Sequence, residues 1–449
     1  MRMECDSTRR MSRRDFVRAC AGAVAAPQIV HSSVLGLRGA TPPNDRITIA
    51  LVGLGTQMKM HHGIFLGYSE TQVVAVCDCE GICLKREQDR GNAHYAKQLG
   101  QERYDGVAAY RDFREIVARD DVDAMVIATP NHWHALIAVA ALKSGKDVYC
   151  EKPLALTIRE GRAMVEAAQK EKDVIVQIGF QRRQSPAIQQ AREYIRQGNL
   201  GRVIQADAQI HYTAGILDTT PQDPPASLDW DLWSGPAPKL PYCPQIGHFA
   251  WRLEKTTGHG HLVDWGIHLI DATRYILGET TPKSVQASGG IYYFKDKITT
   301  PDILSVQFDF ETCPVFWKHR IYDAAEYTPE VSNGIFFYGE KGTIFVTDQR
   351  WVIIPRGRDA ERIEHNVKAD MGAAHMAEFL GAVRARQQPG CTIEEGFRST
   401  ATVKLAMIAY EVGAKIAWDD RTEQITNHTQ ANALLKREYR APWKHPYQD

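Results

Sequence analysis

Up to about residue 180, the sequence alternates short apolar runs with segments of helical length, and no other feature constrains the fold as strongly. Strands that are apolar throughout are buried on both faces, as in a parallel sheet that helices cover from each side. Because crossovers between parallel strands are right-handed, such a unit is expected to be doubly wound. The apolar runs are residues 47–52, 73–77, 124–128, 148–150 and 174–178.

The pattern changes after about residue 201. A long loop rich in Pro, Trp and Asp (219–248) precedes one expected helix, Leu262–Leu277. Strand-like runs then follow one another without intervening helices, which is typical of an antiparallel sheet. These runs are 284–294, 304–310, 315–322, 334–338 and 343–347. A chain of 449 residues usually holds two cores. We therefore expect a parallel α/β domain at 41–200 and, at 201–449, an α+β domain with a large, mostly antiparallel open sheet and C-terminal helices.

The N-terminus has the order of a signal segment. Ser12-Arg13-Arg14-Asp15-Phe16-Val17-Arg18 precedes an apolar, small-residue run at 19–30 that is too short to span a membrane. This order resembles a twin-arginine signal, which exports folded proteins; the alternative is an ordinary basic N-terminus. We predict a signal peptide and linker over residues 1–40, cleavage between Ala26 and Thr41, a periplasmic mature protein and no membrane span in the mature chain.

The balance of charges and the spacing of the cysteines limit which partners, substrates and metals are expected. Lys plus Arg equals Asp plus Glu, 54 each, so net charge gives no reason to expect nucleic acid or an anionic membrane as a partner. A small, uncharged or weakly charged substrate fits better. Cys77, Cys79 and Cys83 cluster without the second Cys or His pair of a zinc site, so we expect free thiols and no metal.

A glycine turn follows the first apolar run. Gly53-Leu54-Gly55 ends the run, and Thr56 and Gln57 begin the expected helix. The glycines permit a tight turn and let the backbone approach a pyrophosphate, which then lies at the helix N-terminus. The third glycine of the G-x-G-x-x-G pattern serves helix–strand packing and is Met58 here. The turn indicates a Rossmann-type dinucleotide site with one departure from the pattern.

Asp78 ends the second apolar run and strengthens this interpretation. A carboxylate at this place accepts hydrogen bonds from a ribose diol and repels a 2′-phosphate. NAD is therefore expected rather than NADP. The alternative is that Asp78 caps the following helix.

Lys152 and Pro153 follow the apolar run at 148–150. Ligands of a doubly wound sheet bind outside the carboxyl ends of its strands, and Pro153 restricts the turn that directs the lysine there. The lysine could hydrogen-bond a substrate hydroxyl and stabilise a developing alkoxide. The alternative is a surface ion pair with Glu151.

A second candidate group lies on the expected helix at 262–277. Asp264 and His268 are four residues apart and share a face, with Asp271 one turn further along. A carboxylate can orient an imidazole or bind sugar hydroxyls, and the imidazole can move a proton near neutral pH. The alternative is a surface pair that contributes only a small stabilising energy.

In their order along the chain, these motifs resemble those of the Gfo/Idh/MocA oxidoreductases, the family of glucose–fructose oxidoreductase and inositol dehydrogenase. The motifs are the glycine turn, Asp78, ATPNHWHA (128–135), EKP (151–153) and Asp264-x-x-x-His268. Three further segments, 228–238, 339–346 and 439–443, resemble an exported bacterial branch of the family.

The resemblance implies a first domain that binds NAD(P) and a second domain whose open sheet shapes the substrate site and makes oligomer contacts, in a homodimer or homotetramer. It implies that Lys152 is the catalytic lysine, that His268 relays the hydroxyl proton, and that Asp264 orients the substrate or the histidine. It also implies cofactor contacts at Thr129, Pro130, Asn131, His134, Glu151 and Gln181.

The glycine-rich stretch before Asp264 departs from the family pattern because it contains His259 and His261. We expect these histidines to cap the helix or to pack rather than to reach the substrate. With His268 they could also ligate a metal ion, but no cluster elsewhere completes such a site, so metal catalysis is not expected.

Hydride transfer between a hydroxyl carbon of a sugar or cyclitol and tightly bound NAD is the leading functional prediction. Free NAD should be scarce outside the cytoplasm, so an exported enzyme would have to regenerate its cofactor in place. The alternative is therefore a redox-neutral glycoside hydrolase or lyase that acts through a transient keto-sugar. A non-enzymatic sugar-binding protein is disfavoured because Lys152, Asp264 and His268 are all present.

Overall fold

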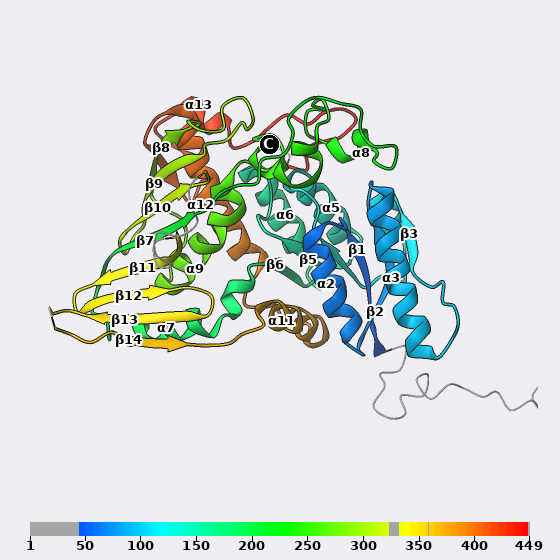
Figure 1. The fold of residues 1–449 in the computed structure, drawn as a ribbon, viewed down its shortest axis with the longest axis horizontal. Coiled ribbons are helices and arrows are strands. Elements are labelled where there is room, and N and C mark those ends of the chain that lie inside the picture. Colours follow the sequence, from blue (N-terminus) through cyan, green and yellow to red (C-terminus); the bar gives the residue numbers. More distant parts are fainter. Residues whose placement is uncertain (1–44, 323–331, 358, 448–449) are drawn as a thin grey trace, which may run out of the picture. The chain divides into compact units, whose positions relative to one another are not determined.

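The computed structural model describes residues 45–322, 332–357 and 359–447, so the predicted signal segment lies outside the described residues. Residues 47–449 form one compact unit built around two sheets (Figure 1). Among the described residues, no helix combines the length and the apolar composition that a membrane span requires.

The first sheet has six parallel strands in the order β3-β2-β1-β4-β5-β6. This order confirms the predicted doubly wound topology and places its switch point between β1 and β4, where such sheets bind ligands. The strands are β1 Ile47–Val52, β2 Thr71–Cys77, β3 Ala108–Tyr110, β4 Ala124–Ile127, β5 Asp147–Glu151 and β6 Val176–Gly179.

Helices cover both faces of this sheet because alternate residues of each strand point to opposite sides. Ile49 and Leu51 of β1 belong to a core that α2 (Thr56–Gly67) and α11 (Met371–Ala385) complete. Ala50 and Val52 belong to the core on the other face, with α5 (Asn131–Lys143) and α6 (Ile158–Lys170). The C-terminal part of the chain therefore returns to the first sheet, where α11 lies beside α2 (Figure 1).

The second sheet has ten strands in the order β14-β13-β12-β11-β7-β10-β9-β8-β15-β16, and all pairs are antiparallel except β7 with β10. The predicted open, mostly antiparallel sheet is confirmed. The strands are β7 Val203–His211, β8 Ser284–Gly290, β9 Ile303–Asp309, β10 Pro314–Arg320, β11 Asn333–Gly339, β12 Gly342–Val346, β13 Arg350–Pro355, β14 Ile363–Asn366, β15 Ile416–Asp419 and β16 Gln424–Ile425.

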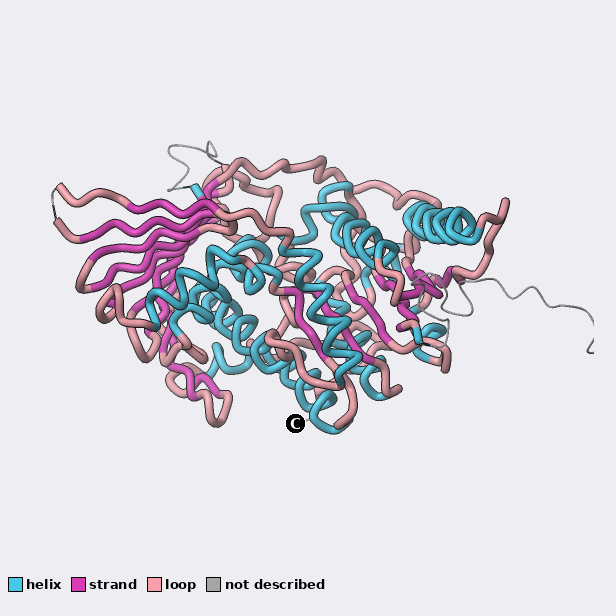
Figure 2. The backbone as a smooth tube through the Cα atoms, turned by 90° about the horizontal axis from the view of Figure 1, so that it is seen from below, coloured by secondary structure: helices cyan, strands magenta, loops and turns pink. Residues whose placement is uncertain are grey.

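Three helices pack against this sheet: α7 (Pro186–Arg196), α9 (Ile267–Leu277) and α12 (Ile393–Val412). Figure 2 shows helices gathered along one side of the strands. The remaining helices are α3 Gly81–Leu99, α4 Phe113–Val117, α8 Trp230–Ser234 and α13 Thr429–Ala433.

The segment before α9 differs from the expected single helix at 262–277. Leu262–Gly266 is a π-helical turn, and the α-helix begins only at Ile267. The long loop before it is also partly ordered, as a π-helical turn at Gln245–Phe249 and a 3₁₀ turn at Ala250–Leu253. Short π-helical segments often occur at functional sites, and this one carries Asp264.

Candidate active site

The glycine turn joins the loops that follow β1 and β4. Gly53 has φ +83°, and a Cβ built on it would lie 2.6 Å from the Thr129 backbone nitrogen, so only glycine fits this approach. At Gly55, in contrast, an added Cβ would meet no atom within 4 Å. Helix α2 begins at the next residue without a side-chain cap. Open space beside an uncapped helix N-terminus is suited to a pyrophosphate.

Asp78 holds this turn from the neighbouring strand. Its carboxylate accepts hydrogen bonds from the backbone N–H groups of Leu54 (2.6 Å) and Glu80 (2.8 Å). Burial raises the pKa of the Asp78 carboxyl above its ordinary value, although both N–H groups oppose the shift. The cap of α3 is Glu80, whose side chain accepts from the Cys83 N–H, so the alternative reading of Asp78 as that cap does not apply.

A cavity of about 550 Å³ opens at this switch point, which is within the usual size of a cofactor site. Seven of the predicted cofactor residues line it: Gly53, Gly55, Thr56, Gln57, Asp78, Thr129 and Pro130. The wall also contains cationic and aromatic residues that the sequence did not indicate, namely Arg86, Arg111, Trp133, Trp233, Trp251 and Arg252. The residues present fit a bound dinucleotide.

Two other predicted cofactor residues do not belong to that wall and make hydrogen bonds within the protein. The Asn131 side chain donates to the Gly258 carbonyl (3.0 Å). The two ring nitrogens of His134 lie 2.8 Å from the carbonyl oxygens of Pro153 and Thr129. Both side chains are buried and connect the β4 and β5 loops to their surroundings. Their contact with a cofactor stays a prediction.

Glu151 and Gln181 belong to a hydrogen-bond network that includes the backbone of Lys152. The Glu151 carboxylate lies 2.8 Å from His61 Nε2 and accepts from Gln181 Nε2 (2.8 Å), and its second oxygen accepts from the Lys152 backbone N–H (3.2 Å). Burial opposes its ionisation, but His61, Lys152 and His375 together outweigh burial and hold the pKa of Glu151 below its ordinary value. Gln57 connects this network to the cavity, since it lines the wall and donates to Glu151 (3.3 Å).

The Lys152 side chain is bound to Asp264, not to Glu151. Its Nζ donates to the Asp264 carbonyl (2.7 Å) and to Oδ1 (2.9 Å), and the two side chains are only 16% and 13% exposed. Arg252 Nε lies 3.2 Å from the same Oδ1. Because Arg252 also lines the cavity, the ion pair lies beside the cofactor site. Burial disfavours the charged carboxylate, but Lys152 and Arg252 outweigh it and hold the pKa of Asp264 well below its ordinary value.

His268 lies on α9, four residues after Asp264. Burial, followed by the charges of Lys152 and Arg182, lowers the pKa of His268 well below its ordinary value, so the imidazole is neutral at neutral pH. Its Nδ1 is buried and has no hydrogen-bond partner among the described residues. A neutral ring with an unsatisfied nitrogen can exchange a proton with a ligand. Asp271 is separate from this group and binds Arg183 (2.7 and 2.9 Å).

The two histidines of the glycine-rich stretch, His259 and His261, contact different residues. His261 supplies no side-chain cap and packs its ring against Tyr212 (4.8 Å between centroids) and His319 (5.1 Å). His259 Nε2 lies 2.7 Å from Glu411. Within the described ranges, no three His, Cys, Asp or Glu side chains come together as a metal site.

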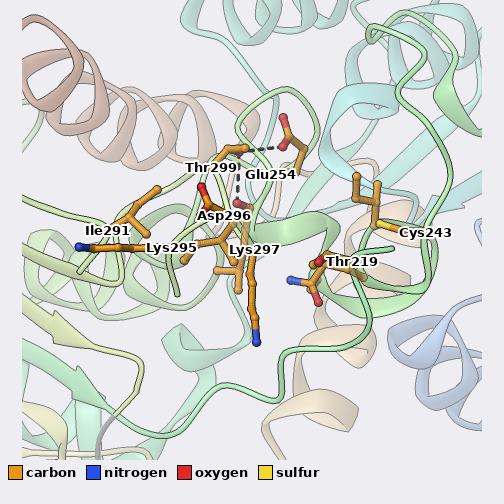
Figure 3. A pocket seen from close by; sticks show the side chains of 13 residues that line it. Thr219, Cys243, Glu254, Ile291, Lys295, Asp296, Lys297 and Thr299 are labelled. Carbon is orange, nitrogen blue, oxygen red and sulfur yellow. Dashed lines mark hydrogen bonds between the residues drawn. The ribbon is translucent and has the colours of Figure 1, made fainter. Parts of the chain in front are cut away.

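A second cavity, of about 600 Å³, is lined in part by residues of the segment 245–254 (Figure 3). The long loop at 219–248 contributes Thr219, Cys243 and Gln245 to its wall. At its edge the Thr299 hydroxyl donates to Glu254 (2.7 Å). The segment 245–254 therefore contributes to the walls of both cavities, since Trp251 and Arg252 line the cofactor cavity.

Two of the residues that the sequence analysis missed contact the predicted site residues Glu151 and Asp264 directly. His61 is four residues after Gln57 on α2, and this spacing on one helix face could have indicated that both reach the same partner. Arg252 lies in a loop without periodicity, and only the fold brings it to Asp264.

Together, the fold and these contacts define a dinucleotide-binding protein with a charged side-chain cluster beside its cofactor cavity. Residues 47–180 match the domain described as "Oxidoreductase family, NAD-binding Rossmann fold", and residues 207–445 match "Oxidoreductase family, C-terminal alpha/beta domain". The chain belongs to the Gfo/Idh/MocA family of oxidoreductases. The predicted family and its NAD-binding first domain are thereby confirmed.

Known relatives are similar to parts of the chain. Levoglucosan dehydrogenase of Pseudarthrobacter phenanthrenivorans is 35% identical over 169 residues, 37% of this chain and 36% of that protein. A glycosyl hydrolase family 109 protein of a Shewanella species is 29% identical over 191 residues, 42% of this chain and 39% of that protein. The chain thus matches well under half the length of either relative. Aldose-aldose oxidoreductase from Caulobacter crescentus shares the fold, with a TM-score of 0.63 at 20% identity over 83% of this chain and 99% of that one.

Proposed function

We propose that this protein transfers a hydride between a hydroxyl-bearing carbon of a sugar or cyclitol and tightly bound NAD. The observation that carries the proposal is the group of Lys152, Asp264 and His268 beside the cofactor cavity, connected to its wall by Arg252. The similarity to levoglucosan dehydrogenase over 37% of the chain supports a sugar-like substrate.

The three side chains divide the work of activating a hydroxyl group. Asp264 fixes Lys152 through two hydrogen bonds, which leaves the ammonium with a further N–H for a substrate oxygen. A cation held at that place stabilises negative charge that develops on the oxygen. His268, neutral because it is buried, accepts the hydroxyl proton at a ring nitrogen.

The cofactor would be held by the turn at Gly53 and Gly55, the N-terminus of α2 and the Asp78 carboxylate. NAD, when bound, accepts the hydride of the carbinol carbon. The Glu151 carboxylate, which His61 contacts, accepts a hydrogen bond from the Lys152 backbone N–H. The backbone of Lys152 is therefore fixed by Glu151 and its side chain by Asp264.

A redox-neutral glycoside hydrolase or lyase is the second candidate. It is favoured by the similarity to a glycosyl hydrolase family 109 protein over 42% of the chain. The same lysine and histidine would remove the hydroxyl proton while bound NAD serves as the hydride acceptor, and the resulting transient ketone acidifies the neighbouring C–H so that a leaving group departs. Water would then add and the hydride would return to the sugar, so that no net reduction of NAD occurs.

One experiment distinguishes the two. The purified protein is mixed with a panel of free sugars, cyclitols and aryl glycosides, once with added NAD and once without, and reduced nicotinamide and released aglycone are followed together. Steady formation of reduced nicotinamide with a free polyol supports the dehydrogenase. Release of aglycone without added NAD and without net reduction supports the hydrolase, and neither signal with any compound contradicts both.

We further propose export by the twin-arginine route to the periplasm and assembly as a homodimer or homotetramer. The Arg13-Arg14 pair before an apolar run supports the first, and the broad open sheet supports the second. Loss of export on replacing both arginines with lysine, and light scattering of the purified protein, test the two proposals separately.

A further inference from the structure

A small pocket away from the cofactor cavity contains a buried lysine with its own base. Lys404 lies on α12 and is 2% exposed. The pocket beside it measures about 210 Å³, and its wall includes Lys404, His259 and Glu411. Neither proposed mechanism uses any of these three side chains.

The three side chains form a linear chain of hydrogen bonds. Glu411 Oε1 lies 2.7 Å from His259 Nε2, and His259 Nδ1 lies 3.3 Å from Lys404 Nζ. A carboxylate only accepts hydrogen bonds, so the Nε2 of a neutral ring carries the proton and Nδ1 is left as an acceptor directed at the amine. This is the order of carboxylate, base and nucleophile that activates a side chain for attack.

The backbone holds His259 in a conformation that a non-glycine residue seldom adopts. Its φ is +74°, and the following Gly260 has φ +93°. Such a conformation is strained in a residue with a side chain. The loop is secured by the His259 and Gly260 N–H groups, which donate to the Glu254 and Arg252 carbonyls (3.1 and 2.7 Å). Strain of this kind is concentrated at functional sites.

Lys404 is also in the state that a nucleophile requires. Burial lowers the pKa of Lys404 to about 7, with Arg437 acting in the same direction and Glu160 and Glu411 opposing it. At neutral pH about half of the amine would be uncharged, against well under 1% for an ordinary lysine with a pKa near 10.4. Burial likewise lowers the pKa of His259, so the ring can accept a proton only transiently.

We propose that this pocket is a second ligand site, in which the Lys404 amine condenses with a small aldehyde or ketone that carries a carboxylate. The carboxylate is inferred from the rest of the wall, where the cations are Lys255, Lys436 and Arg437, and the acids are Glu438 and Glu411. Arg437 is already paired with Glu160, and Glu411 with His259. A positive lining of this kind favours an anionic ligand.

The condensation balances without an oxidant or a metal. The Nζ lone pair forms a bond to the carbonyl carbon, and the π pair of the C=O bond moves to oxygen. His259 Nδ1 carries one proton from nitrogen to this oxygen, which gives a carbinolamine. It then carries the second nitrogen proton to the departing hydroxyl group while the nitrogen lone pair forms the C=N bond. The products are an imine and one molecule of water.

The test uses the full-length protein at neutral pH with glyoxylate or pyruvate as the probe and cyanoborohydride to reduce the imine to a stable amine. Peptide mass spectrometry then compares the extent of modification at Lys404 with that at Lys85, whose side chain is 75% exposed. We expect modification at Lys404 to exceed that at Lys85 by about tenfold or more, given its larger uncharged fraction. The extent of modification at Lys404 should level off above neutral pH, while the extent of modification at exposed lysines continues to rise with pH.

Two variants and one control complete the design. Lys404→Met should remove the modification, and His259→Asn, which tolerates the same backbone conformation, should slow it by about 10²-fold. Acetaldehyde, which lacks the carboxylate, should react more slowly than glyoxylate. The proposal is overturned if wild-type Lys404 reacts no faster than Lys85, a result that requires no variant to fold, or if glyoxylate binds without forming an adduct. An unchanged rate in a folded His259→Asn protein refutes the role of the histidine.

Discussion

The replacement Asp264→Asn tests the charged group of the active site through stability as well as activity. Asp264 compensates two cations, since its Oδ1 lies 2.9 Å from Lys152 Nζ and 3.2 Å from Arg252 Nε. Removing one partner of a buried ion pair costs about 3–5 kcal/mol because the remaining charge stays uncompensated. Asparagine keeps an acceptor oxygen and the site is slightly exposed, so we expect a loss of about 2–3 kcal/mol of unfolding free energy.

A surface pair in the same chain provides a matched control. Lys85 and Asp89 are also 2.9 Å apart, but their side chains are 75% and 58% exposed. Exposed pairs of this spacing contribute about 0.3–0.5 kcal/mol, so Asp89→Asn should leave the unfolding free energy almost unchanged. Urea denaturation of the wild type and both variants at neutral pH measures the difference.

The pH dependence gives an independent check on the same residue. The pKa of Asp264 lies below its unfolded value, so its stabilisation is fully present above about pH 4 and is lost as the pH falls further. The wild type should therefore lose stability in acid more steeply than Asp264→Asn. Equal unfolding free energies for the Asp264 and Asp89 variants, together with parallel acid limbs, would refute the reasoning.

The remaining predictions concern the base, the glycine turn and the ribose carboxylate. The lowered pKa of His268 keeps the ring neutral as the pH falls through 6.5, so the acid limb of kcat/KM should lie below pH 6.5, and an acid limb at or above pH 6.5 contradicts the assignment. His268→Gln should reduce kcat by about 10²–10⁴-fold. Gly55→Ala should keep the unfolding free energy within about 0.5 kcal/mol of wild type and weaken NAD binding by about tenfold or more, because the added methyl group fills only open space. Gly53→Ala should instead destabilise the fold by about 1–2 kcal/mol or more, given φ +83° and the contact with Thr129. Asp78→Ser should raise the preference for NADP over NAD by about tenfold or more, because repulsion of a 2′-phosphate is removed. Urea denaturation measures the stability of both glycine variants, and equilibrium binding of both cofactors measures the Gly55 and Asp78 variants; an unchanged NADP to NAD ratio refutes the prediction for Asp78→Ser.

The local pattern of apolar residues was sufficient to predict the parallel sheet. Strands β1, β2, β4, β5 and β6 are apolar runs buried on both faces, and such runs stand out in a sequence. Strand β3 did not stand out because its three residues are only half-buried. Strand β7 was missed because apolar residues alternate with polar ones along VIQADAQIH, so the segment has no continuous apolar run.

Contacts between distant segments could not be predicted from periodicity. Helix α11 completes a core with β1 although more than 300 residues separate them in sequence. The ion pair of Lys152 with Asp264 joins positions 112 apart. The family resemblance assigned both residues to the active site, but neither it nor the spacing predicted that they pair. Arg252 belongs to an irregular loop, for which the sequence offers no rule that would place its side chain at Asp264.

Asp264 and His268 were expected to share one face of a single α-helix, and the structure differs from this expectation. Asp264 lies in a π-helical turn and His268 in the α-helix that follows. A π turn is wider than an α turn, so Asp264 faces Lys152 and Arg252 while the Nδ1 of His268 stays without a partner among the described residues. The sequence predicted one continuous α-helix here and gave no sign of the π-helical turn that carries Asp264.

The central claim is that the Lys152 ammonium group acts on the substrate and not on the cofactor. Its most direct test is to measure NAD binding and turnover side by side in wild type and Lys152→Met, with a polyol that the wild type oxidises. We expect NAD affinity within about threefold of wild type and a kcat lower by about 10²–10³-fold. Turnover that survives the replacement, or a loss of NAD binding as large as the loss of kcat, would contradict the claim.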